Sequence, residues 1–360
     1  MRVSALGIGL SLIFIGCTSF VHPPRVPHQR SSSSYDTNRC GIVGRRSPPA
    51  TSSVSHIRSV EATAGGVVPD VYILSEVLAG VVVAASEAGA HMKAKIGADV
   101  LKTKFNPKDL LTEVDSECQG IIERVMSHEF PEHALLGEES VEPGSEASAA
   151  ALQHALANPG GEESDGADWL WIVDPIDGTT NFVHGMPLSA VSIGVAYRGQ
   201  VVVGCIYDPF RDELFTATRG NGAFLNGLRM TVGAQTSIEE ATVACGAPPG
   251  ILALGPCVRG MAGLAPHVRT TRMLGSAAIM LAWVACGRLT CYWEPDLNSW
   301  DVAGGSILIE EAGGLMTDID GSPYSLSTRA IIGSNKLVHE DIRKILVEAE
   351  ATRPDVTPRL

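Results

Sequence analysis

The chain has few basic residues for its length: 27 Lys and Arg stand against 40 Asp and Glu, a net charge of −13 over 360 residues. A chain that wraps nucleic acid needs a basic surface, so this balance argues against a nucleic-acid partner. None of the eight cysteines belongs to a Cys-X-X-Cys pair, so neither a zinc knuckle nor a dithiol redox motif is predicted. Charged residues make up only 19% and hydrophobic residues 45%, which excludes a disordered chain and predicts a globular protein with a substantial core.

The first 60 residues differ in composition from the rest. They contain seven arginines, no lysine and one acidic residue, a net charge of +6, so the remaining 300 residues carry −19. The apolar run Val3–Gly16 is too short to span a bilayer comfortably, and the small residues CTS at 17–19 offer a cleavage site before Phe20. This pattern is typical of a secretory signal peptide, whereas the Arg-, Ser- and Pro-rich stretch 20–59 is typical of a transit peptide.

The order of these two segments resembles the bipartite plastid leader of algae with secondary plastids, which implies a plastid location. Secretion is the alternative. The residues FIGC at 14–17 allow a third interpretation as a bacterial lipoprotein site, although Phe14 fits such a site poorly. Residues 1–60 lie outside the folded domain in all three interpretations, and we expect no membrane attachment after removal of the leader.

Hydrophobic periodicity beyond the leader predicts both helices and strands. A long amphipathic helix is expected over 71–95 and a second over 115–130, followed by a short strand, 134–136, that leads into the acidic sequence GEES. Two β-rich runs, 191–197 and 201–207, are joined by RGQ and predict a hairpin. Strands and helices then alternate towards the C-terminus, so the chain is predicted to form an α/β fold of stacked layers.

These patterns divide the chain into four segments. They are a leader at 1–60, an N-terminal αβ subdomain at 61–232, a C-terminal αβ subdomain at 233–350 and a tail at 351–360. Within the N-terminal subdomain, residues 141–168 contain six acidic residues and no Lys or Arg around an alanine-rich middle. This composition predicts a surface insertion with one or two helical turns.

The strongest chemical motif is WIVDPIDGTTNFVHG at 171–185. An apolar strand leads into Asp174, and Asp177 follows three residues later across a proline turn. Two carboxylates and a backbone carbonyl form a hard oxygen site that suits Mg²⁺ and not zinc. Gly178 allows a phosphate to approach the backbone, where the amides of Gly178 and Thr179 can donate to it if a helix begins there. The alternative is an Asp-rich turn capped by threonine.

Two further acidic residues stand at the ends of predicted elements. Glu138 follows the strand 134–136, where a carboxylate is desolvated at a cost unless it meets a cation. Asp301 opens an apolar helix in the sequence WDVAGG at 300–305. Each residue also has a simpler interpretation, since Glu138 can be a solvated loop acid and Asp301 can be an N-cap or first-turn acid.

Together these motifs resemble the inositol monophosphatase family, and the resemblance covers nearly all of the chain beyond the leader. The fold that it implies is an αβαβα sandwich of two stacked subdomains. The matching sequences are GEES at 137–140, WIVDPIDGTTNFVHG at 171–185, WDVAGGSILIEEAGG at 300–314, DLLTEVD at 109–115, RMLGSAA at 272–278 and the single residue Lys104.

The resemblance implies metal ligands residue by residue. The first Mg²⁺ would be bound by Glu138, Asp174, the carbonyl of Ile176 and Thr179. The second would be bound by Asp174, Asp177 and Asp301, and Glu138 would share a third ion through water.

The resemblance also implies catalytic and substrate contacts. Asp115 and Thr179 would orient and activate the attacking water, with Glu138 as a further catalytic carboxylate. Glu294 would bind sugar hydroxyls, and Lys104 would add positive potential at the mouth of the site. The full set of implied substrate contacts is Gly178, Thr179, Ser276, Ala277, Glu294 and Lys104.

The implied activity is Mg²⁺-dependent hydrolysis of inositol monophosphate or a similar small sugar phosphate. Histidinol phosphate and galactose 1-phosphate are alternative substrates, while bisphosphates are disfavoured because no extra basic cluster accompanies the motifs. A catalytically silent scaffold or regulatory relative is an alternative of another class, but such a protein should have lost a ligand and this chain retains all of them. A homodimer and sensitivity to lithium are further implications of the resemblance.

Overall fold

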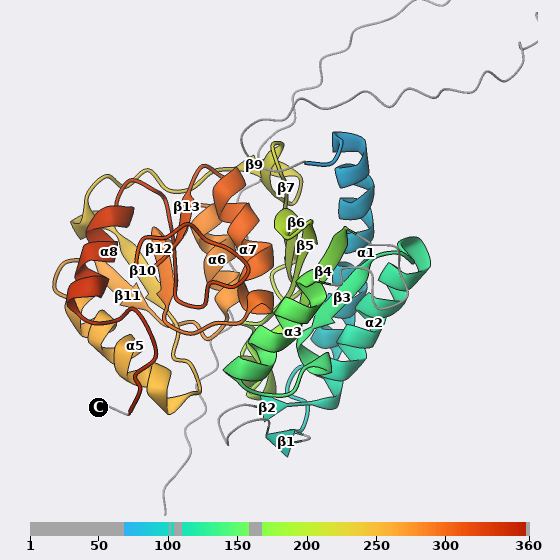
Figure 1. Ribbon diagram of the computed structural model, residues 1–360, viewed down its shortest axis with the longest axis horizontal. Coiled ribbons are helices and arrows are strands. Elements are labelled where there is room, and N and C mark those ends of the chain that lie inside the picture. Colours follow the sequence, from blue (N-terminus) through green and yellow to red (C-terminus); the bar gives the residue numbers. More distant parts are fainter. Residues whose placement is uncertain (1–67, 101, 104–109, 158–167, 358–360) are drawn as a thin grey trace, which may run out of the picture. The chain divides into compact units, whose positions relative to one another are not determined.

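The computed structural model describes residues 68–100, 102–103, 110–157 and 168–357 (Figure 1). The leader at 1–60, Lys104 and most of the non-helical part of the acidic insertion lie outside the described residues. The described residues all belong to one compact unit, so the predicted division of the chain at residue 233 stays a prediction.

A seven-stranded sheet forms the larger half of the fold, with its strands in sequence order. β3 pairs in parallel with β4, and every later neighbour is antiparallel. The predicted hairpin is confirmed: Arg198 and Gly199 both adopt positive φ, as a two-residue hairpin turn requires. The strands are β3 (Ala134–Gly137), β4 (Trp169–Asp177), β5 (Ala190–Tyr197), β6 (Gln200–Asp208), β7 (Glu213–Thr218), β8 (Gly222–Leu225) and β9 (Leu228–Met230).

A five-stranded mixed sheet forms the other half, in the order β11-β10-β12-β14-β13. Its central strand, β12, is parallel to β10 and antiparallel to β14. A separate two-stranded ribbon joins β1 (Lys102–Thr103) to β2 (Leu110–Leu111). The strands of the mixed sheet are β10 (Thr242–Cys245), β11 (Thr270–Arg272), β12 (Cys291–Glu294), β13 (Leu315–Asp318) and β14 (Ile331–Ser334).

Helices cover both sheets and separate them, so the layers run α, β, α, β, α (Figure 1). On the outer face of the large sheet lie α1 (Val71–Ala94) and α2 (Glu113–Glu129). Between the sheets lie α6 (Ala277–Ala285) and α7 (Ser299–Glu311). The outer face of the small sheet is covered by α5 (Ile251–Leu264) and α8 (His339–Glu348). This arrangement confirms the predicted αβαβα sandwich.

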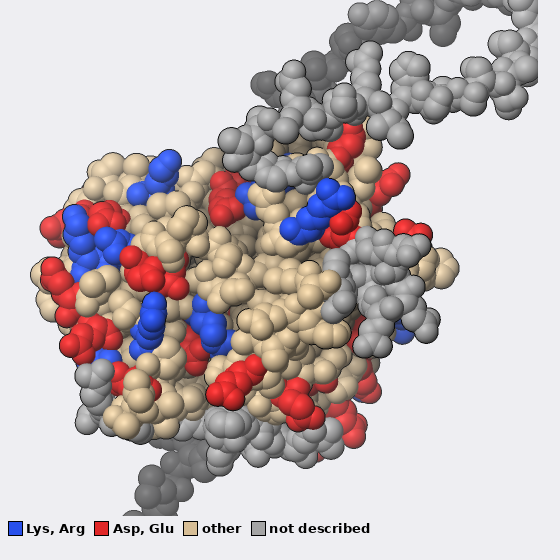
Figure 2. All heavy atoms as spheres, in the orientation of Figure 1, with Lys and Arg blue, Asp and Glu red and all other residues tan. Residues whose placement is uncertain are grey.

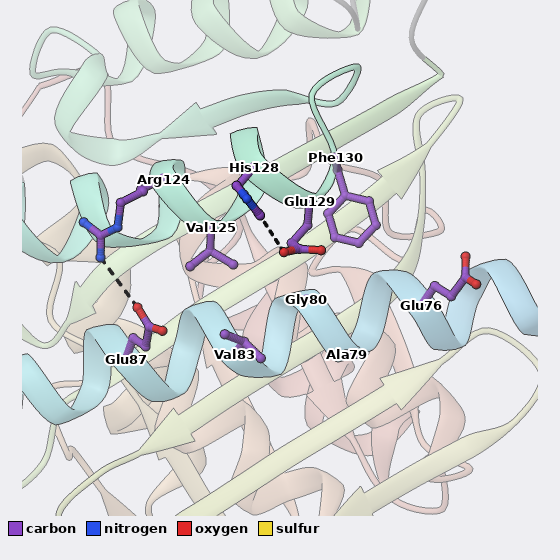
Figure 3. Close-up of a pocket in the computed structure, with 10 residues that line it drawn as sticks. All are labelled: Glu76, Ala79, Gly80, Val83, Glu87, Arg124, Val125, His128, Glu129 and Phe130. Carbon is purple, nitrogen blue, oxygen red and sulfur yellow. Dashed lines mark hydrogen bonds and ion pairs between the residues drawn. The ribbon is translucent and has the colours of Figure 1, made fainter.

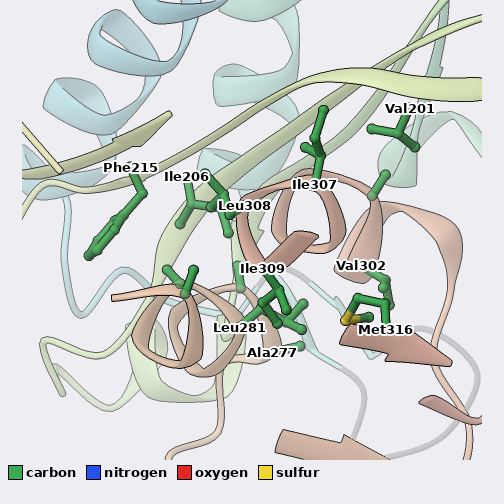
Figure 4. Close-up of a cluster of buried hydrophobic side chains, with 14 of the residues drawn as sticks. Val201, Ile206, Phe215, Ala277, Leu281, Val302, Ile307, Leu308, Ile309 and Met316 are labelled. Atoms are coloured by element: carbon green, nitrogen blue, oxygen red, sulfur yellow. The ribbon is translucent and has the colours of Figure 1, made fainter. Parts of the chain in front are cut away.

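The main hydrophobic core lies around α6 and α7, between the two sheets (Figure 4). Leu281 of α6 and Ile307 of α7 are fully buried, together with Ile206 of the large sheet and Met316 of the small one. Because sheets lie on both sides of α7, apolar or small residues surround the helix between Asp301 in its first turn and the two glutamates, Glu310 and Glu311, at its end. The core therefore holds the helix that carries Asp301 in a defined position.

Among the described helices, only α1 is long and apolar enough to cross a membrane by length and composition. Its buried stripe, which includes Val81, Ala84 and Ala88, packs against α2 and the large sheet. Such a stripe of small and apolar residues is the pattern of a helix that covers a sheet in a folded domain.

The acidic insertion differs from its prediction. In place of one or two turns, it contains α3 (Ser145–Ala157), a helix of 13 residues. Its alanines and leucines have high helix propensity, and Leu152 adds a side chain that is buried in the main core. The prediction underestimated the helix because acidic composition does not reveal that Leu152 is buried in a core built by distant residues. Over the face in Figure 2, basic and acidic side chains are interspersed among the described residues.

Candidate active site

The end of β4 turns two carboxylates towards one point. Asp174 and Asp177 are only 2% and 6% exposed, and the pairing of β4 with β5 shifts register between them. Such an irregularity breaks the alternation of side chains along a strand, so both acids can serve one site. The backbone N–H of Ile176 donates to Asp174 Oδ1 at 3.0 Å and holds the turn between them. A carboxylate oxygen of Asp301 completes the group, in which the three oxygens lie within 4.8 Å of one another.

The first turn of α6 holds Asp177. The backbone N–H of Ala278 donates to Asp177 Oδ2 at 2.8 Å, and that of Ala277 donates to Oδ1 at 3.2 Å. The hydroxyl of Ser276 also donates to Asp177 Oδ2 and accepts the N–H of Ile279, so it caps the helix as well. Two predicted substrate contacts, Ser276 and Ala277, thus touch a predicted metal ligand.

The first turn of α7 holds Asp301. The backbone N–H of Asn298 donates to Asp301 Oδ2 at 2.7 Å, in the manner of a first-turn acid that caps its own helix. Asp301 can therefore be both a helix cap and a site residue, because its carboxylate accepts the N–H of Asn298 and also lies within 4.8 Å of those of Asp174 and Asp177.

Burial and mutual repulsion make the carboxylates of this group costly to charge. Burial raises the pKa of Asp177 to about 6, despite the hydrogen bonds from the α6 turn. Burial, followed by repulsion from Glu138 and Asp177, raises the pKa of Asp301 well above its ordinary value. Charged carboxylates in such a place are costly unless a cation compensates them.

Glu138 stands directly after β3, in the short 3-10 turn Glu138–Ser140. Gln119 of α2 anchors this turn, since its Oε1 accepts the N–H of Glu139 at 2.9 Å and its Nε2 donates to Ser140 at 2.7 Å. The charge of Glu138 contributes to the raised pKa of both Asp177 and Asp301. Its carboxylate is not one of the three whose oxygens lie within 4.8 Å of one another.

Asp115 and Thr179 lie in contact although 64 residues separate them. The hydroxyl of Thr179 lies 3.3 Å from Asp115 Oδ1 and 3.1 Å from the carbonyl oxygen of Ile176, so its single proton has two acceptors. Thr112 fixes the other carboxylate oxygen of Asp115, through its N–H at 2.8 Å and its hydroxyl at 2.5 Å. Asp115 is therefore buried and rigidly oriented towards Thr179.

Gly178 adopts a φ of +92° between β4 and α4 (Thr179–Val183). A Cβ built there would lie 2.9 Å from the carbonyl oxygen of Leu188 and 3.0 Å from that of Gly275. Both the backbone conformation and the close approach require glycine. This position brings the turn between β4 and α4 against the segment that carries Ser276.

Glu294 ends β12 and is 5% exposed. The hydroxyl of Tyr292 donates to Glu294 Oε2, and the carboxylate packs against Gly246, where a Cβ would lie 1.8 Å from it. Burial raises the pKa of Glu294 well above its ordinary value, and repulsion from Asp301 and Asp177 acts in the same direction. Glu294 therefore belongs to the electrostatic neighbourhood of the carboxylate group.

Several residues that position the site were not among the sequence-based candidates: Thr112, Gln119, Tyr292 and Asn298. Thr112 had a recognisable pattern, because TEVD at 112–115 is a capping-box sequence. Asn298 also has one, because it caps α7 three residues before Asp301, and Tyr292 lies two residues before Glu294 on the same strand. Only Gln119 depends on a contact between different elements and has no local pattern. Lys104, a predicted substrate contact, lies outside the described residues.

A groove of about 770 Å³ runs between α1 and α2 (Figure 3). Val83, Val125 and Phe130 line it, and the ion pair between Arg124 and Glu87, at 3.5 Å, crosses it. None of the candidate site residues lines the groove. We therefore place the candidate active site at the carboxylate group and not in this groove.

The donor set fits a small divalent cation. Among the described residues, this is the one group of three or more potential ligands, and it contains neither histidine nor cysteine. Hard oxygen donors favour Mg²⁺ over zinc. The described cysteines lie elsewhere as free thiols, five of them buried.

Comparisons with known proteins agree with this geometry. The model of the "Inositol monophosphatase family" matches residues 73–351. The inositol-1-monophosphatase of Mesorhizobium japonicum is 34% identical over 282 residues, which cover 78% of this chain and 99% of that protein. Inositol monophosphatase 3 of Solanum lycopersicum is 38% identical over 67% of this chain and 85% of its own length. The crystal structure of the extragenic suppressor protein suhB from Bartonella henselae superposes with a TM-score of 0.66 at 35% identity, over 75% of this chain and 98% of that one. The chain belongs to the inositol monophosphatase family.

Proposed function

We propose that this protein is a Mg²⁺-dependent phosphomonoesterase that hydrolyses inositol monophosphate or a similar small sugar phosphate. The observation that carries the proposal is the convergence of Asp174, Asp177 and Asp301 within 4.8 Å, together with the contact between buried Asp115 and half-buried Thr179. The names of the relatives from Mesorhizobium japonicum and Solanum lycopersicum support the choice of substrate.

The ions would be held by oxygen ligands from three parts of the chain: Glu138 after β3, Asp174, Ile176 and Asp177 at the end of β4, and Asp301 in α7. When bound, Mg²⁺ supplies positive charge to the transferring phosphoryl group and activates water. The pKa values of Asp177 and Asp301, raised by burial, fit carboxylates that are built to meet such a charge.

Asp115 and Thr179 would receive the proton of the attacking water. The Thr179 hydroxyl donates to Asp115 and can accept from a water on its other side, so a proton can move from the water through Thr179 to the carboxylate. The water oxygen then forms a bond to phosphorus as the bond from phosphorus to the sugar oxygen breaks. The leaving sugar oxygen takes up a proton from solvent and Asp115 returns its proton to solvent, so the products are inorganic phosphate and the free alcohol.

The alcohol half of the substrate would meet Glu294, Ser276 and Ala277. A buried carboxylate can accept hydrogen bonds from neighbouring hydroxyls of a polyol, which a substrate without them cannot offer. Histidinol phosphate and galactose 1-phosphate remain competing substrates of the same site.

The test measures phosphate release by the purified protein from a panel of phosphomonoesters, with Mg²⁺ and with excess chelator. We expect turnover of inositol monophosphate only with Mg²⁺, with inhibition by Ca²⁺, which prefers a larger and looser shell, and by Li⁺. Full turnover in excess chelator would exclude the metal-dependent reaction. Faster hydrolysis of another phosphomonoester of the panel would show that this compound, and not inositol monophosphate, is the preferred substrate.

The chain offers a matched pair of variants, because GEES occurs twice. Glu138 follows a buried strand, whereas Glu162 lies in the glycine-rich part of the insertion, outside the described residues. A catalytic carboxylate must be held within about half an ångström of its working position. Glu138→Gln should therefore remove most activity, and Glu162→Gln should keep it within about twofold. The reverse result would mean that the second GEES supplies the ligand.

We also propose that residues 1–60 direct the chain to a plastid, that the mature protein has no membrane attachment and that it forms a homodimer. The leader composition and the family resemblance support these statements. A fluorescent protein fused to residues 1–60 would report the compartment, with secretion as the competing outcome. Sedimentation of the purified protein would report its oligomeric state.

A further inference from the structure

A single short loop joins two parts of the site. Residues 295–298 connect Glu294, the last residue of β12, to α7, whose first turn contains Asp301. The position of this loop therefore affects the carboxylate group and the predicted sugar contact together.

Arg329 clamps the loop at three consecutive residues. Its Nε donates to Asp296 Oδ1 at 2.7 Å, and its Nη1 donates to Asn298 Oδ1 at 3.0 Å. Its backbone carbonyl accepts the N–H of Leu297 at 2.9 Å. A planar guanidinium that reaches two side chains at once restrains the loop more than a single-point contact would.

The clamped loop in turn holds Asp301. The N–H of Asn298, the last residue of the loop, donates to Asp301 Oδ2 at 2.7 Å. A shift of Asn298 would therefore move or free a carboxylate whose oxygen lies within 4.8 Å of those of Asp174 and Asp177.

The outer side of Arg329 meets the inserted helix. Nη1 also donates to the Ser148 hydroxyl of α3 at 3.1 Å, and that hydroxyl donates to the carbonyl of Ser145 at 3.0 Å, which orients it to accept from the arginine. Ser148 is 6% exposed. One turn further along α3, Leu152 is buried in the same hydrophobic cluster as Leu297 of the loop. The helix thus contacts both the clamp and the core beneath it.

We propose that Arg329 is a positioning residue for Asp301 and that the inserted helix α3 braces it through Ser148. This assignment rests on the proposed metal site. The proposal gives a role to the insertion between Glu138 and Asp174. These two residues belong to the proposed metal site, and α3, which lies between them in the sequence, supports Asp301 on the other side of that site.

The test measures direct Mn²⁺ binding, followed by the loss of the free-ion EPR signal, in the wild-type protein and in matched variants. Arg329→Lys retains the charge but lacks the planar guanidinium whose separate nitrogens reach Asp296 and Asn298. The Kd for Mn²⁺ should therefore rise roughly tenfold or more, as for other groups that orient metal ligands. Ser148→Ala removes one hydrogen bond and should raise the Kd roughly two- to fivefold. Gln153→Ala, exposed on the same helix, should leave it unchanged.

A second readout separates positioning from general stability. At saturating Mg²⁺ the kcat of Arg329→Lys and Ser148→Ala should return to within about threefold of wild type, because metal binding favours the geometry that the clamp provides. The Mg²⁺ concentration needed for half activity should rise in step with the Mn²⁺ Kd. The melting temperature without metal is measured in parallel.

Wild-type Mn²⁺ affinity in Arg329→Lys, even with a lowered melting temperature, would overturn the positioning role. Equal affinities in Ser148→Ala and Gln153→Ala would overturn the brace from α3. If Arg329→Lys does not fold, Asp296→Asn removes one partner of the arginine and is judged by the same criteria. If the wild-type protein binds no more Mn²⁺ than Asp301→Asn, the proposed metal site itself is wrong and the assignment of Arg329 falls with it.

Discussion

At the scale of single residues, the acids of the site serve local structure and chemistry together. Asp115 closes a capping box with Thr112 at the start of α2 and also faces Thr179. Asp301 does the same at the start of α7 while it belongs to the carboxylate group. A helix start is a favourable place for a functional carboxylate, because the backbone N–H groups there stabilise its charge and fix its orientation.

Thr179→Ala tests the role given to the threonine hydroxyl. The substitution removes the link from water to Asp115 but leaves the carboxylates of the metal site in place. We expect kcat at saturating Mg²⁺ to fall by roughly 10²–10⁴-fold, the usual contribution of a positioned proton acceptor. Steady-state kinetics over a range of Mg²⁺ concentrations measures both kcat and the Mg²⁺ concentration needed for half activity.

The neighbouring Thr180 is a matched control, because its side chain is exposed in the same short helix. Thr180→Ala should stay within about twofold of wild type. If Thr179→Ala keeps a near-normal kcat, water activation does not pass through this hydroxyl. If it loses Mg²⁺ affinity instead, Thr179 acts mainly as a ligand.

At the scale of elements, α7 is the part of the fold on which the site depends most. It packs against β4, β5, β6 and β7 of the large sheet on one side and against β13 and α6 on the other. Glycines permit this approach: a Cβ built at Gly204 of β6 would lie 2.5 Å from the carbonyl oxygen of Gly304 and 2.4 Å from Ile307 Cγ2. Because one of these atoms is backbone, the helix would have to move to accept a methyl group.

Gly204→Ala should therefore lower the free energy of unfolding by about 1–3 kcal/mol, the usual cost of overpacking a core. Urea denaturation measures this change, and Mg²⁺-dependent activity should decline with it, because Asp301 lies in α7. Gly120→Ala is the matched control, since a Cβ on this helical glycine of α2 meets nothing within 4 Å. It should be neutral or stabilising by up to about 1 kcal/mol. Equal stabilities of the two variants would show that the contact of α7 with β6 is not tight.

At the scale of the whole molecule, α8 is joined to the small sheet through a buried histidine. His339 lies 2.9 Å from the hydroxyl of Thr317 in β13 and 2.8 Å from that of Ser334 in β14. Burial lowers the pKa of His339 to about 4. The folded protein therefore favours the neutral imidazole, whereas the unfolded chain takes up a proton near pH 6.5.

This shift makes stability depend on pH. The contribution of His339 to the free energy of unfolding is present above about pH 6.5 and is lost as the pH falls from about 6.5 to about 4. His339→Gln, which keeps a donor and an acceptor but does not titrate, should lose less stability over this interval, by an amount on the order of 3 kcal/mol. Urea denaturation at several pH values compares the two proteins. Parallel pH profiles would show that His339 is readily protonated in the folded state.

Most elements and the chemical character of the site can be predicted from local sequence. Periodicity predicted a helix over 71–95, and α1 spans Val71–Ala94; the hairpin 191–207 also appears as predicted. These predictions depend on neighbours along the chain, because local spacing sets which face of an element is apolar. The same local information failed for α3, whose extent depends on the burial of Leu152 in a core that distant residues build.

Which candidate residues lie in contact depends on how the helices and sheets pack. Asp174 and Asp301 come together because α7 is enclosed between two sheets, and Asp115 meets Thr179 because α2 lies against the strand that ends beside it. The clamp by Arg329 and the anchoring by Gln119 have no sequence pattern, since each joins elements whose proximity is set by packing. Residue types and spacing carry the chemistry, but distances between side chains from different elements depend on how the whole core packs, and no local pattern encodes that.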